Sequence, residues 1–415
     1  MTSPSGAQDV WLYGTQIARL ERQGERIRLT WSEAAAPTFG LGSRVVSHLL
    51  PTQKPAQRPH DLAVAVFLAG LLAEGHLREH LAMEAATTSD DIFGLIAAYG
   101  RDTAGGLVFV PAGEQPSAGR WEPIADPDIA TLLRAAGRFA PGGIDSISLA
   151  GLQPKIALRR FAGTWYRCRE GAASTHIIKL GVDPGQPLAD LIHVEAACLD
   201  LARRCELTCV EAHVDTFDGV PALVVVRYDR ITEDDGSVQR LHQEDSAQAL
   251  GLNTGDLNRK FQRGKTLPSL REIAKVLRDG GSEPDKLAAL TTLNLAVGNS
   301  DAHAKNISIM RHPDGLAELA PAYDISAHAH YATFSGLFAM DVNGKTRMLD
   351  MTGRDLVEEA QQWPLSHRRA RRAVEDTLAR LSDALSALDR SQHAGVSASA
   401  WEKIEGRTAQ LLESL

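Results

Sequence analysis

The feature that most constrains the fold is a change in hydrophobic pattern near Leu241. Before it, short apolar runs separated by turn residues, such as SISLAGLQPKIALRR, WYRCRE, THIIKL and ALVVVRYDR, predict strands, with one helix at ADLIHVEAACLDLARRC. After it, helical spacing dominates, as in SLREIAKVLRD and RRAVEDTLARLSDALSAL. We therefore expect a strand-rich lobe followed by a helical lobe, an arrangement in which a nucleotide can lie between the two.

A third block precedes these two. VWLYGTQIARLERQGERIRLTW predicts a small antiparallel meander, and DLAVAVFLAGLLAEGHLREHLAM predicts a helix with Asp61 as its N-cap. The Pro- and Gly-containing stretch PAGEQPSAGRWEPIADP predicts a boundary. The 415 residues are enough for several cores, and we expect domains at residues 1–115, 124–230 and 231–415.

Composition excludes some classes of function. The net charge of -8 gives no large basic surface for nucleic acid. The longest apolar stretch, LAVAVFLAGLLA, is too short to span a bilayer, and the N-terminus lacks a signal-peptide pattern. Zinc is not expected. His328 and His330 lack a third ligand, and no matching pair of Cys or His completes a zinc-binding motif with the four cysteines, Cys168, Cys198, Cys205 and Cys209. We expect a soluble, cytoplasmic protein with reduced thiols.

The octet NSDAHAKN, residues 299–306, concentrates polar groups between a predicted helix and the strand-like pieces NISIM and LAELAPAYDIS. One interpretation is a cap, in which Asp301 or Asn299 accepts backbone N–H bonds at the end of the helix. The other is a catalytic loop. Both remain open on the octet alone.

Phosphoryl transfer requires a carboxylate near the attacking hydroxyl, metal ligands and a phosphate-binding lysine. Asp301 and Asn306 have the spacing of the base and the metal-binding amide in the protein-kinase catalytic loop. Asp324 is a candidate second metal ligand, and Lys179 a candidate strand lysine with Glu195 as its ion-pair partner. Each alone could be a helix cap or a surface charge. Their order along the chain favours a kinase.

Six segments, SLAGLQPKIAL, THIIKL, VVRYDR, HQEDSAQALG, NSDAHAKNISIM and LAPAYDIS, resemble the signatures of the HipA family, the serine/threonine kinase toxins of bacterial type II toxin–antitoxin modules. FGLIAAYGRDTAGGLVFVP resembles the N-terminal domain of that family. The resemblance covers nearly the whole chain. It implies an α+β, two-lobed protein-kinase-like fold, with a small mixed β-rich N-terminal domain, a kinase N-lobe with phosphate loop and hinge, and an all-helical C-lobe.

The resemblance also implies roles for individual residues. Asp301 would be the catalytic base, Asn306 and Asp324 would bind Mg²⁺, and Lys179 would bind the phosphates of ATP. The hinge, Val226 to Tyr228, would hold adenine through its backbone. The other implied nucleotide-contacting residues are Asp229, near the ribose, His303, Lys305 and Tyr323.

The resemblance places a phosphate loop at SISLAGLQPK, with Ser148, Ala150 and Gly151 at the nucleotide. Autophosphorylation of Ser148 would add about -1.5 to -2 charges and repel ATP, which switches the kinase off. Ser146 is a second candidate for this modification. Without the family, SIS reads as a strand with two solvent-facing hydroxyls. The proline in this loop removes one backbone donor, so the contacts of relatives cannot be copied.

As a member of that family the chain would be an ATP- and Mg²⁺-dependent serine/threonine protein kinase. Its expected substrate is a translation component such as an aminoacyl-tRNA synthetase, and the expected outcome is growth arrest and persistence. A helix-turn-helix, HipB-like antitoxin would be the partner, with DNA contacted only through it. The alternatives are a pseudokinase that acts as an antitoxin-binding scaffold and a small-molecule phosphotransferase. The basic stretch GDLNRKFQRGKTLPS could engage a substrate or be a solvated loop.

Overall fold

The computed structural model describes residues 6–138, 153–183, 185–264 and 266–415, and the chain divides into two compact units. Unit 1 comprises Met1–Leu180, Thr216–Leu257 and Met310–Leu316, and unit 2 comprises Gly181–Asp215, Asn258–Ile309 and Ala317–Leu415. The chain therefore passes between the units several times. The units differ from the predicted domain limits of 1–115, 124–230 and 231–415, which stay a prediction.

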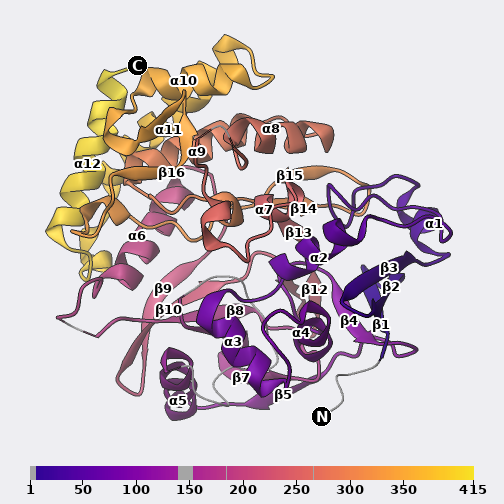
Figure 1. The fold of residues 1–415 in the computed structure, drawn as a ribbon. Helices are drawn as coiled ribbons and strands as arrows, with labels where there is room; N and C mark the ends of the chain where they lie inside the picture. Colours follow the sequence, from indigo (N-terminus) through magenta and orange to yellow (C-terminus); the bar gives the residue numbers. More distant parts are fainter. Residues whose placement is uncertain (1–5, 139–152, 184, 265) are drawn as a thin grey trace. The chain divides into compact units, whose positions relative to one another are not determined.

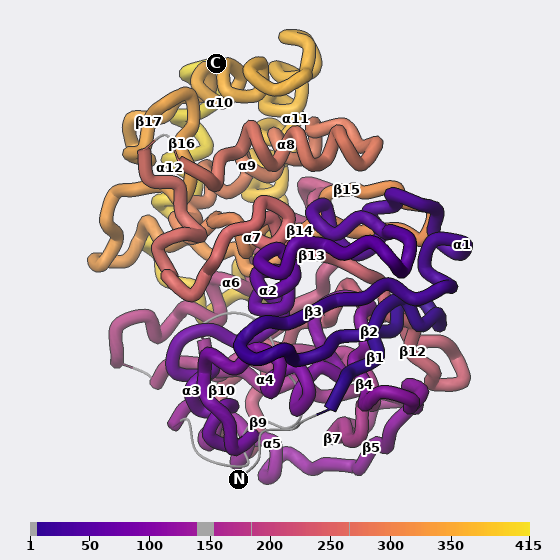
Figure 2. Tube along the Cα trace, turned by 45° about the vertical axis from the view of Figure 1, so that its right-hand side comes forward, coloured from indigo at the N-terminus to yellow at the C-terminus, as the bar shows by residue number. Residues whose placement is uncertain are grey.

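Unit 1 begins with a four-stranded antiparallel sheet of order β3-β2-β1-β4. The predicted meander forms its first three strands, which run side by side in Figure 2. Helices α2 and α4 pack against the sheet. The elements are β1 (Gln8–Leu12), β2 (Thr15–Gln23), β3 (Arg26–Trp31), α1 (Ala35–Phe39), α2 (Asp61–Gly70), α3 (Gly75–Glu84), α4 (Ile92–Tyr99) and β4 (Val108–Pro111).

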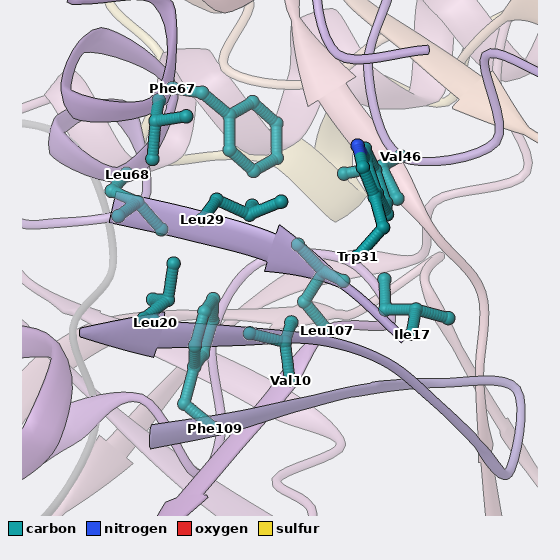
Figure 3. Close-up of a pocket in the computed structure, with 11 residues that line it drawn as sticks. Val10, Ile17, Leu20, Leu29, Trp31, Val46, Phe67, Leu68, Leu107 and Phe109 are labelled. Atoms are coloured by element: carbon teal, nitrogen blue, oxygen red, sulfur yellow. The ribbon is translucent and has the colours of Figure 1, made fainter. Parts of the chain in front are cut away.

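The core of this sheet encloses a small cavity lined only by apolar and aromatic side chains (Figure 3). Leu20 and Trp31 reach it from the strands, and Phe67 and Leu68 from α2. Such a lining offers too few polar partners to hold an ordered water. The region is a packed hydrophobic core, in keeping with the alternating pattern of its strands.

The stretch expected as one helix from Asp61 forms two, α2 and α3, because Glu74 is extended (φ -114°, ψ 161°) between them. The predicted cap is also wrong by one residue. His60 is the N-cap, and its Nδ1 accepts a hydrogen bond from the Leu62 N–H at 3.3 Å. Asp61 is the first helical residue, where a negative charge favours the helix dipole.

A second sheet of six strands, in the order β5-β7-β6-β8-β10-β9, carries the strands predicted between residues 155 and 226, whereas the start of the SISLAGLQPKIALRR stretch lies outside the described residues. β5 was not predicted, because its residues lie in the stretch interpreted as a boundary. It pairs with β7 at the sheet edge. The elements are β5 (Arg120–Pro123), α5 (Asp126–Gly137), β6 (Lys155–Phe161), β7 (Thr164–Arg169), β8 (His176–Leu180), β9 (Ala212–Phe217) and β10 (Val220–Val226).

Short elements follow this sheet in unit 1, and one of them places a histidine in the interior. β11 (Arg230–Thr232) pairs with β12 (Val238–Arg240), and β13 (Gln243–Asp245) leads into α7 (Ser246–Ala249). His242, fully buried before β13, accepts a hydrogen bond at Nδ1 from the Gly106 N–H at 3.2 Å, and its Nε2 donates to the Val46 carbonyl at 2.8 Å. These partners require a neutral imidazole, because one can only donate and the other can only accept.

In unit 2 the long helices pack on one another: α9 and α12 lie against α11, which also contacts α6 and α10. In Figure 1, α10, α11 and α12 are orange to yellow and α6 is pink. The predicted helical character is therefore present, but β16 and β17 form an antiparallel hairpin that the sequence did not indicate. The elements are α6 (Leu191–Arg204), α8 (Leu270–Asp279), α9 (Asp285–Val297), β15 (Ala317–Leu319), β16 (Leu337–Val342), β17 (Lys345–Arg347), α10 (Gly353–Gln362), α11 (His367–Ala387) and α12 (Ala398–Glu413). β14 (Ser308–Arg311) begins in unit 2, and its last two residues are assigned to unit 1.

Among the described residues, none of the helices combines the length and the apolar character that a bilayer crossing requires.

We predict that protonation of His242 destabilises unit 1. Burial lowers its pKa to about 4, whereas the unfolded chain keeps the ordinary value. As the pH falls from about 6.5 to 4, the unfolded state binds a proton that the folded state excludes, so the free energy of unfolding decreases by up to about 3 kcal/mol. Urea unfolding at several pH values should show a shallower pH dependence for His242→Gln. The exposed His213→Gln serves as control, and an unchanged slope in His242→Gln would contradict the prediction.

Candidate active site

The octet of residues 299–306 begins where α9 ends at Gly298. This glycine is left-handed (φ 78°, ψ 30°), a conformation that costs other residues free energy. Its carbonyl accepts a hydrogen bond from the Ala329 N–H at 3.0 Å, and a Cβ placed on it would lie 2.7 Å from the Ala329 Cβ. Glycine therefore allows both the sharp exit from the helix and the close approach of the segment after Asp324.

Asn299 closes the end of α9. Its backbone N–H donates to the Asn294 carbonyl at 2.8 Å, and its side-chain Nδ2 donates to Asn294 Oδ1, also at 2.8 Å. Its Oδ1 accepts from the Asp301 N–H at 3.1 Å and lies 3.0 Å from Nδ1 of His328. Asn299 is buried, whereas the Asp301 side chain is 45% exposed. Asn299 thus takes the capping role, and the Asp301 carboxylate is left accessible.

Asn306 and Asp301 are held together by the turn between them. Asn306 Nδ2 donates to the backbone carbonyl of Asp301 at 2.9 Å, and the same carbonyl accepts from the His303 N–H at 2.8 Å. A carbonyl can only accept, so the Asn306 amide must present its nitrogen here and turn its oxygen away. No donor to that oxygen is present in the part of the chain that the structure describes. The five-residue spacing therefore presents one carboxylate and one amide oxygen from a single short loop.

Tyr323 braces the loop from the segment that follows β15. Its hydroxyl donates to the Lys305 carbonyl at 2.7 Å and lies 2.6 Å from Ser308 Oγ. The next residue, Asp324, has a left-handed backbone (φ 55°), which Asp tolerates better than most residues. The Tyr323 hydroxyl thus has an internal role, and the predicted packing of its ring on a nucleotide stays a prediction.

His303 lies beneath the loop rather than on its surface. It is 3% exposed, and its ring contacts Phe261 edge-on at 5.0 Å between centroids. Burial, and next the ammonium of Lys260, lower the pKa of His303 to about 3, so the imidazole is neutral at physiological pH. Lys260 and Phe261 come from the basic stretch that the sequence left open between a substrate loop and a solvated loop. In fact Lys260 is buried, at 6% exposure, as is Lys305.

Asn306 and Asp324 suit a magnesium ion. Mg²⁺ prefers oxygen ligands and usually binds one or two carboxylates together with waters and substrate phosphates. The turned-out Asn306 oxygen is the kind of ligand this requires. Among the described residues no three His, Cys, Asp or Glu side chains cluster as a metal cage. A site of one amide and one carboxylate does not need such a cage.

Lys179 lies in unit 1, on β8 in the interior of the six-stranded sheet. It is 6% exposed, which excludes the alternative of a solvated surface lysine. Lys155 on β6 is its cross-strand partner, so the two ammonium side chains are on the same face of the sheet. Sequence reasoning missed Lys155, although the pairing of PKIAL with HIIKL could have indicated it. The role of Lys179 in binding phosphate stays a prediction.

The predicted hinge follows β10 in unit 1. Val226 ends that strand, paired with His176, and the Tyr228 hydroxyl donates to Gln243 Oε1. Asp229 is buried at 3% exposure, where its Oδ2 accepts from the Gly105 N–H at 2.7 Å. Its carboxylate is therefore engaged within unit 1, and its predicted place near the ribose stays a prediction.

The remaining predicted residues are not brought together by the described structure. Ser146, Ser148, Ala150 and Gly151 lie outside the described residues. Glu195 is buried in α6 of unit 2 and Lys179 belongs to unit 1, so their ion pair stays a prediction.

Two family models match the chain, the HipA-like C-terminal domain over residues 147–385 and the HipA N-terminal domain over residues 8–110. Y4mE of Sinorhizobium fredii, which has a provisional kinase designation, is 30% identical over 83% of this chain and 82% of its own length. The serine/threonine-protein kinase toxin HipA of Shewanella oneidensis is 28% identical over 68% of this chain and 66% of its own length.

A solved Shewanella oneidensis structure, of HipA, HipB and operator DNA, contains a chain similar to this one. The TM-score is 0.81 at 20% sequence identity, with 98% of this chain and 97% of that chain covered. The similarity confirms the expected α+β, HipA-like fold.

We predict that Gly298→Ala destabilises unit 2 by about 1–3 kcal/mol more than Gly344→Ala, because only the first adds a steric overlap to the backbone strain. Gly344, in the β16–β17 turn, has a similar φ of 74° but no heavy atom within 4 Å of an added Cβ. Urea unfolding of both variants measures the difference. Equal losses of stability would contradict the close approach of Ala329 to Gly298.

Proposed function

The chain belongs to the HipA family of protein kinases, and on that premise we propose that it transfers the γ-phosphoryl group of ATP to serine or threonine hydroxyls as the toxin of a toxin–antitoxin module. The observation that carries this proposal is the loop in which Asn299 satisfies the helix end while the Asp301 carboxylate stays 45% exposed. A carboxylate used only as a cap would be engaged by backbone N–H groups.

Asp301 would act as the general base that accepts the proton of the attacking hydroxyl. Its position is fixed by its own backbone, since its N–H is bound by Asn299 and its carbonyl by Asn306 and His303. The side chain, 45% exposed and with its Oδ1 3.7 Å from Nε2 of His303, would face a substrate hydroxyl. His303, held neutral by burial, would support the loop from below rather than exchange protons.

Asn306 and Asp324 would hold Mg²⁺, which would neutralise part of the negative charge on the phosphates. Lys179 would bind the phosphates, and the structure adds Lys155 as a neighbouring cation on the same face of the sheet. The hinge, Val226 to Tyr228, would hold adenine through backbone groups. Tyr323 would keep the metal-binding Asp324 in register with the loop through its bond to the Lys305 carbonyl.

Regulation by autophosphorylation is part of the proposal. Ser148, with Ser146 as the second candidate, would receive phosphate in cis or from another copy. The added charge of about -1.5 to -2 would repel the triphosphate and leave the kinase inactive. The support for this step is the family resemblance of SISLAGLQPK.

The proposed partner is a helix-turn-helix antitoxin, because the Shewanella oneidensis structure contains HipA together with HipB and operator DNA. A net charge of -8 makes direct binding to DNA unfavourable for this chain, so DNA would be contacted through the antitoxin. The proposed substrate is a cytoplasmic protein of translation, such as an aminoacyl-tRNA synthetase. Its phosphorylation would arrest growth.

We predict that wild-type protein incubated with ATP and Mg²⁺ gains phosphate at Ser148 or Ser146, and that Asp301→Asn lowers the rate by about 10²- to 10⁴-fold because the general base is lost. Mass-spectrometric phosphosite mapping over a time course measures both. Asp314→Asn, an exposed acid in the turn between β14 and β15, is the matched control and should leave the rate unchanged.

Two outcomes would contradict this. A rate in Asp301→Asn equal to that of the wild type would exclude Asp301 as the base. Binding of ATP without phosphate on any serine or threonine, in the protein or in added antitoxin and synthetase, would instead favour a pseudokinase scaffold or a small-molecule phosphotransferase.

A further inference from the structure

Unit 1 contains a cluster of five charged side chains, four of them buried and Arg240 partly buried, that joins segments far apart in the sequence. We call it the Asp102 cluster. It connects the loop after α4 with the residues that precede β8 and those that follow β10. Its members are Asp102, Arg227, Asp229, Arg230 and Arg240. The first lies within the part that matches the HipA N-terminal domain, and the other four lie within the HipA-like C-terminal domain.

Arg227 is the hinge residue that enters this cluster. Its guanidinium donates to both carboxylate oxygens of Asp229, at 2.9 and 2.8 Å, and to the Thr103 carbonyl and Ser174 Oγ, each at 2.9 Å. All of its side-chain donor nitrogens are therefore in use. Because the guanidinium is planar and rigid, such a set of bonds fixes the position of the side chain.

Asp102, in the loop after α4, supplies the second carboxylate of the cluster. Its Oδ2 accepts from the Ser174 N–H at 3.0 Å and from Ser174 Oγ at 2.7 Å, and its Oδ1 accepts from Arg230 Nη2 at 2.9 Å. Burial alone would raise the pKa of Asp102, but the guanidiniums of Arg230 and Arg227 outweigh burial and hold that pKa below its ordinary value. The side chain is thus a carboxylate at 2% exposure, and the guanidiniums around it depend on its charge.

The burial pattern shows how the cluster acts on the hinge. Burial alternates along this segment: Val226 and Tyr228 are half-buried, whereas Arg227 and Asp229 are buried. The strand ends at Val226, and the turn at residues 228–229 lets Arg227 bond the Asp229 carboxylate within the cluster. The Arg227 N–H donates to the Thr175 carbonyl at 2.9 Å. The backbone of the hinge is held on this face by side chains and by the loop after α4.

We propose that Asp102 is a positioning residue for nucleotide binding: through Arg227 and Arg230 it holds the hinge backbone where adenine binds. The inference rests on the proposed function, because it takes residues 226–228 as the adenine-binding segment. It makes the N-terminal domain a part of the nucleotide site, although none of its residues need touch the nucleotide. Loss of the Asp102 charge would leave the three guanidiniums of the cluster with the single carboxylate of Asp229, and the hinge would shift to relieve the uncompensated positive charge.

The test is the affinity for ATP of full-length Asp102→Asn, which keeps the side-chain shape and removes the charge. Calorimetric titration with ATP and Mg²⁺, well below the unfolding temperature of each variant, should give a Kd at least tenfold above that of the wild type. In the phosphotransfer assay KM for ATP should rise by a similar factor, while kcat at saturating ATP stays within about threefold. A lesion that only reduced the folded fraction would lower kcat and leave KM unchanged.

Glu244→Gln is the matched control. Glu244 is a buried carboxylate of the same unit, 1% exposed, which accepts from Arg311 Nε at 2.8 Å and from Ser47 Oγ at 2.6 Å, without contact to the hinge. Its Kd for ATP should change less than twofold. Equal weakening in both variants, or unchanged affinity in Asp102→Asn, would overturn the inference.

If Asp102→Asn does not fold, Ser174→Ala tests the inference instead. This substitution removes one hydroxyl from the cluster and keeps all five charged side chains. It should raise Kd for ATP threefold or more, and an unchanged Kd would overturn the inference. If the wild type itself does not bind ATP, it is the proposed function that fails, and the two failures are thereby distinguished.

Discussion

Three guanidiniums and two carboxylates share one buried site in unit 1, and the conformation of the segments around it depends on their mutual neutralisation. A buried charge without a partner is strongly unfavourable, so the loop at residues 101–106, the segment at residues 171–175 and the chain at residues 227–240 must be placed together. Backbone groups complete the arrangement: the carbonyls of Thr103 and Gly105 accept from Arg230, and the Gly105 N–H donates to Asp229. The backbone at residues 226–228, the proposed hinge, is therefore held by buried side chains of the Asp102 cluster.

In unit 2 the structural and the chemical tasks of the octet fall to different residues. Gly298, Asn299 and Tyr323 shape the loop through backbone conformation and internal hydrogen bonds. The Asn306 amide uses its nitrogen for that purpose, and the Asp301 carboxylate is 45% exposed and lies 3.7 Å from Nε2 of His303. We propose that this carboxylate and the Asn306 oxygen serve phosphoryl transfer. His303 is buried against Phe261 beneath the loop and supports it, and because burial lowers the pKa of His303 its imidazole is neutral at physiological pH. Under the proposed function, this separation would allow one short loop to be both stable and reactive.

Much of the fold and the position of the candidate catalytic loop could be predicted from the sequence. Strand and helix periodicity located the six-stranded sheet and the helices of unit 2, and the spacing of Asp301 and Asn306 located the loop. Periodicity could not reveal β5, since RWEP is short and lies in a Pro- and Gly-rich stretch, nor the β16–β17 hairpin. The choice between Asn299 and Asp301 as cap depended on burial, which a polar octet does not encode. Lys155, Lys260 and the Asp102 cluster depend on strand register and tertiary contacts between distant segments, so no local pattern reported them.

We propose that the turned-out Asn306 oxygen and Asp324 bind the metal of a phosphoryl-transfer site. The most direct measurement is electron paramagnetic resonance of Mn²⁺, used in place of Mg²⁺, titrated into the protein with a non-hydrolysable ATP analogue. The account predicts nucleotide-dependent Mn²⁺ binding whose affinity falls by about tenfold or more in Asn306→Ala, as is typical when a metal site loses a supporting group. Equal Mn²⁺ affinity in the wild type and in Asn306→Ala would contradict it.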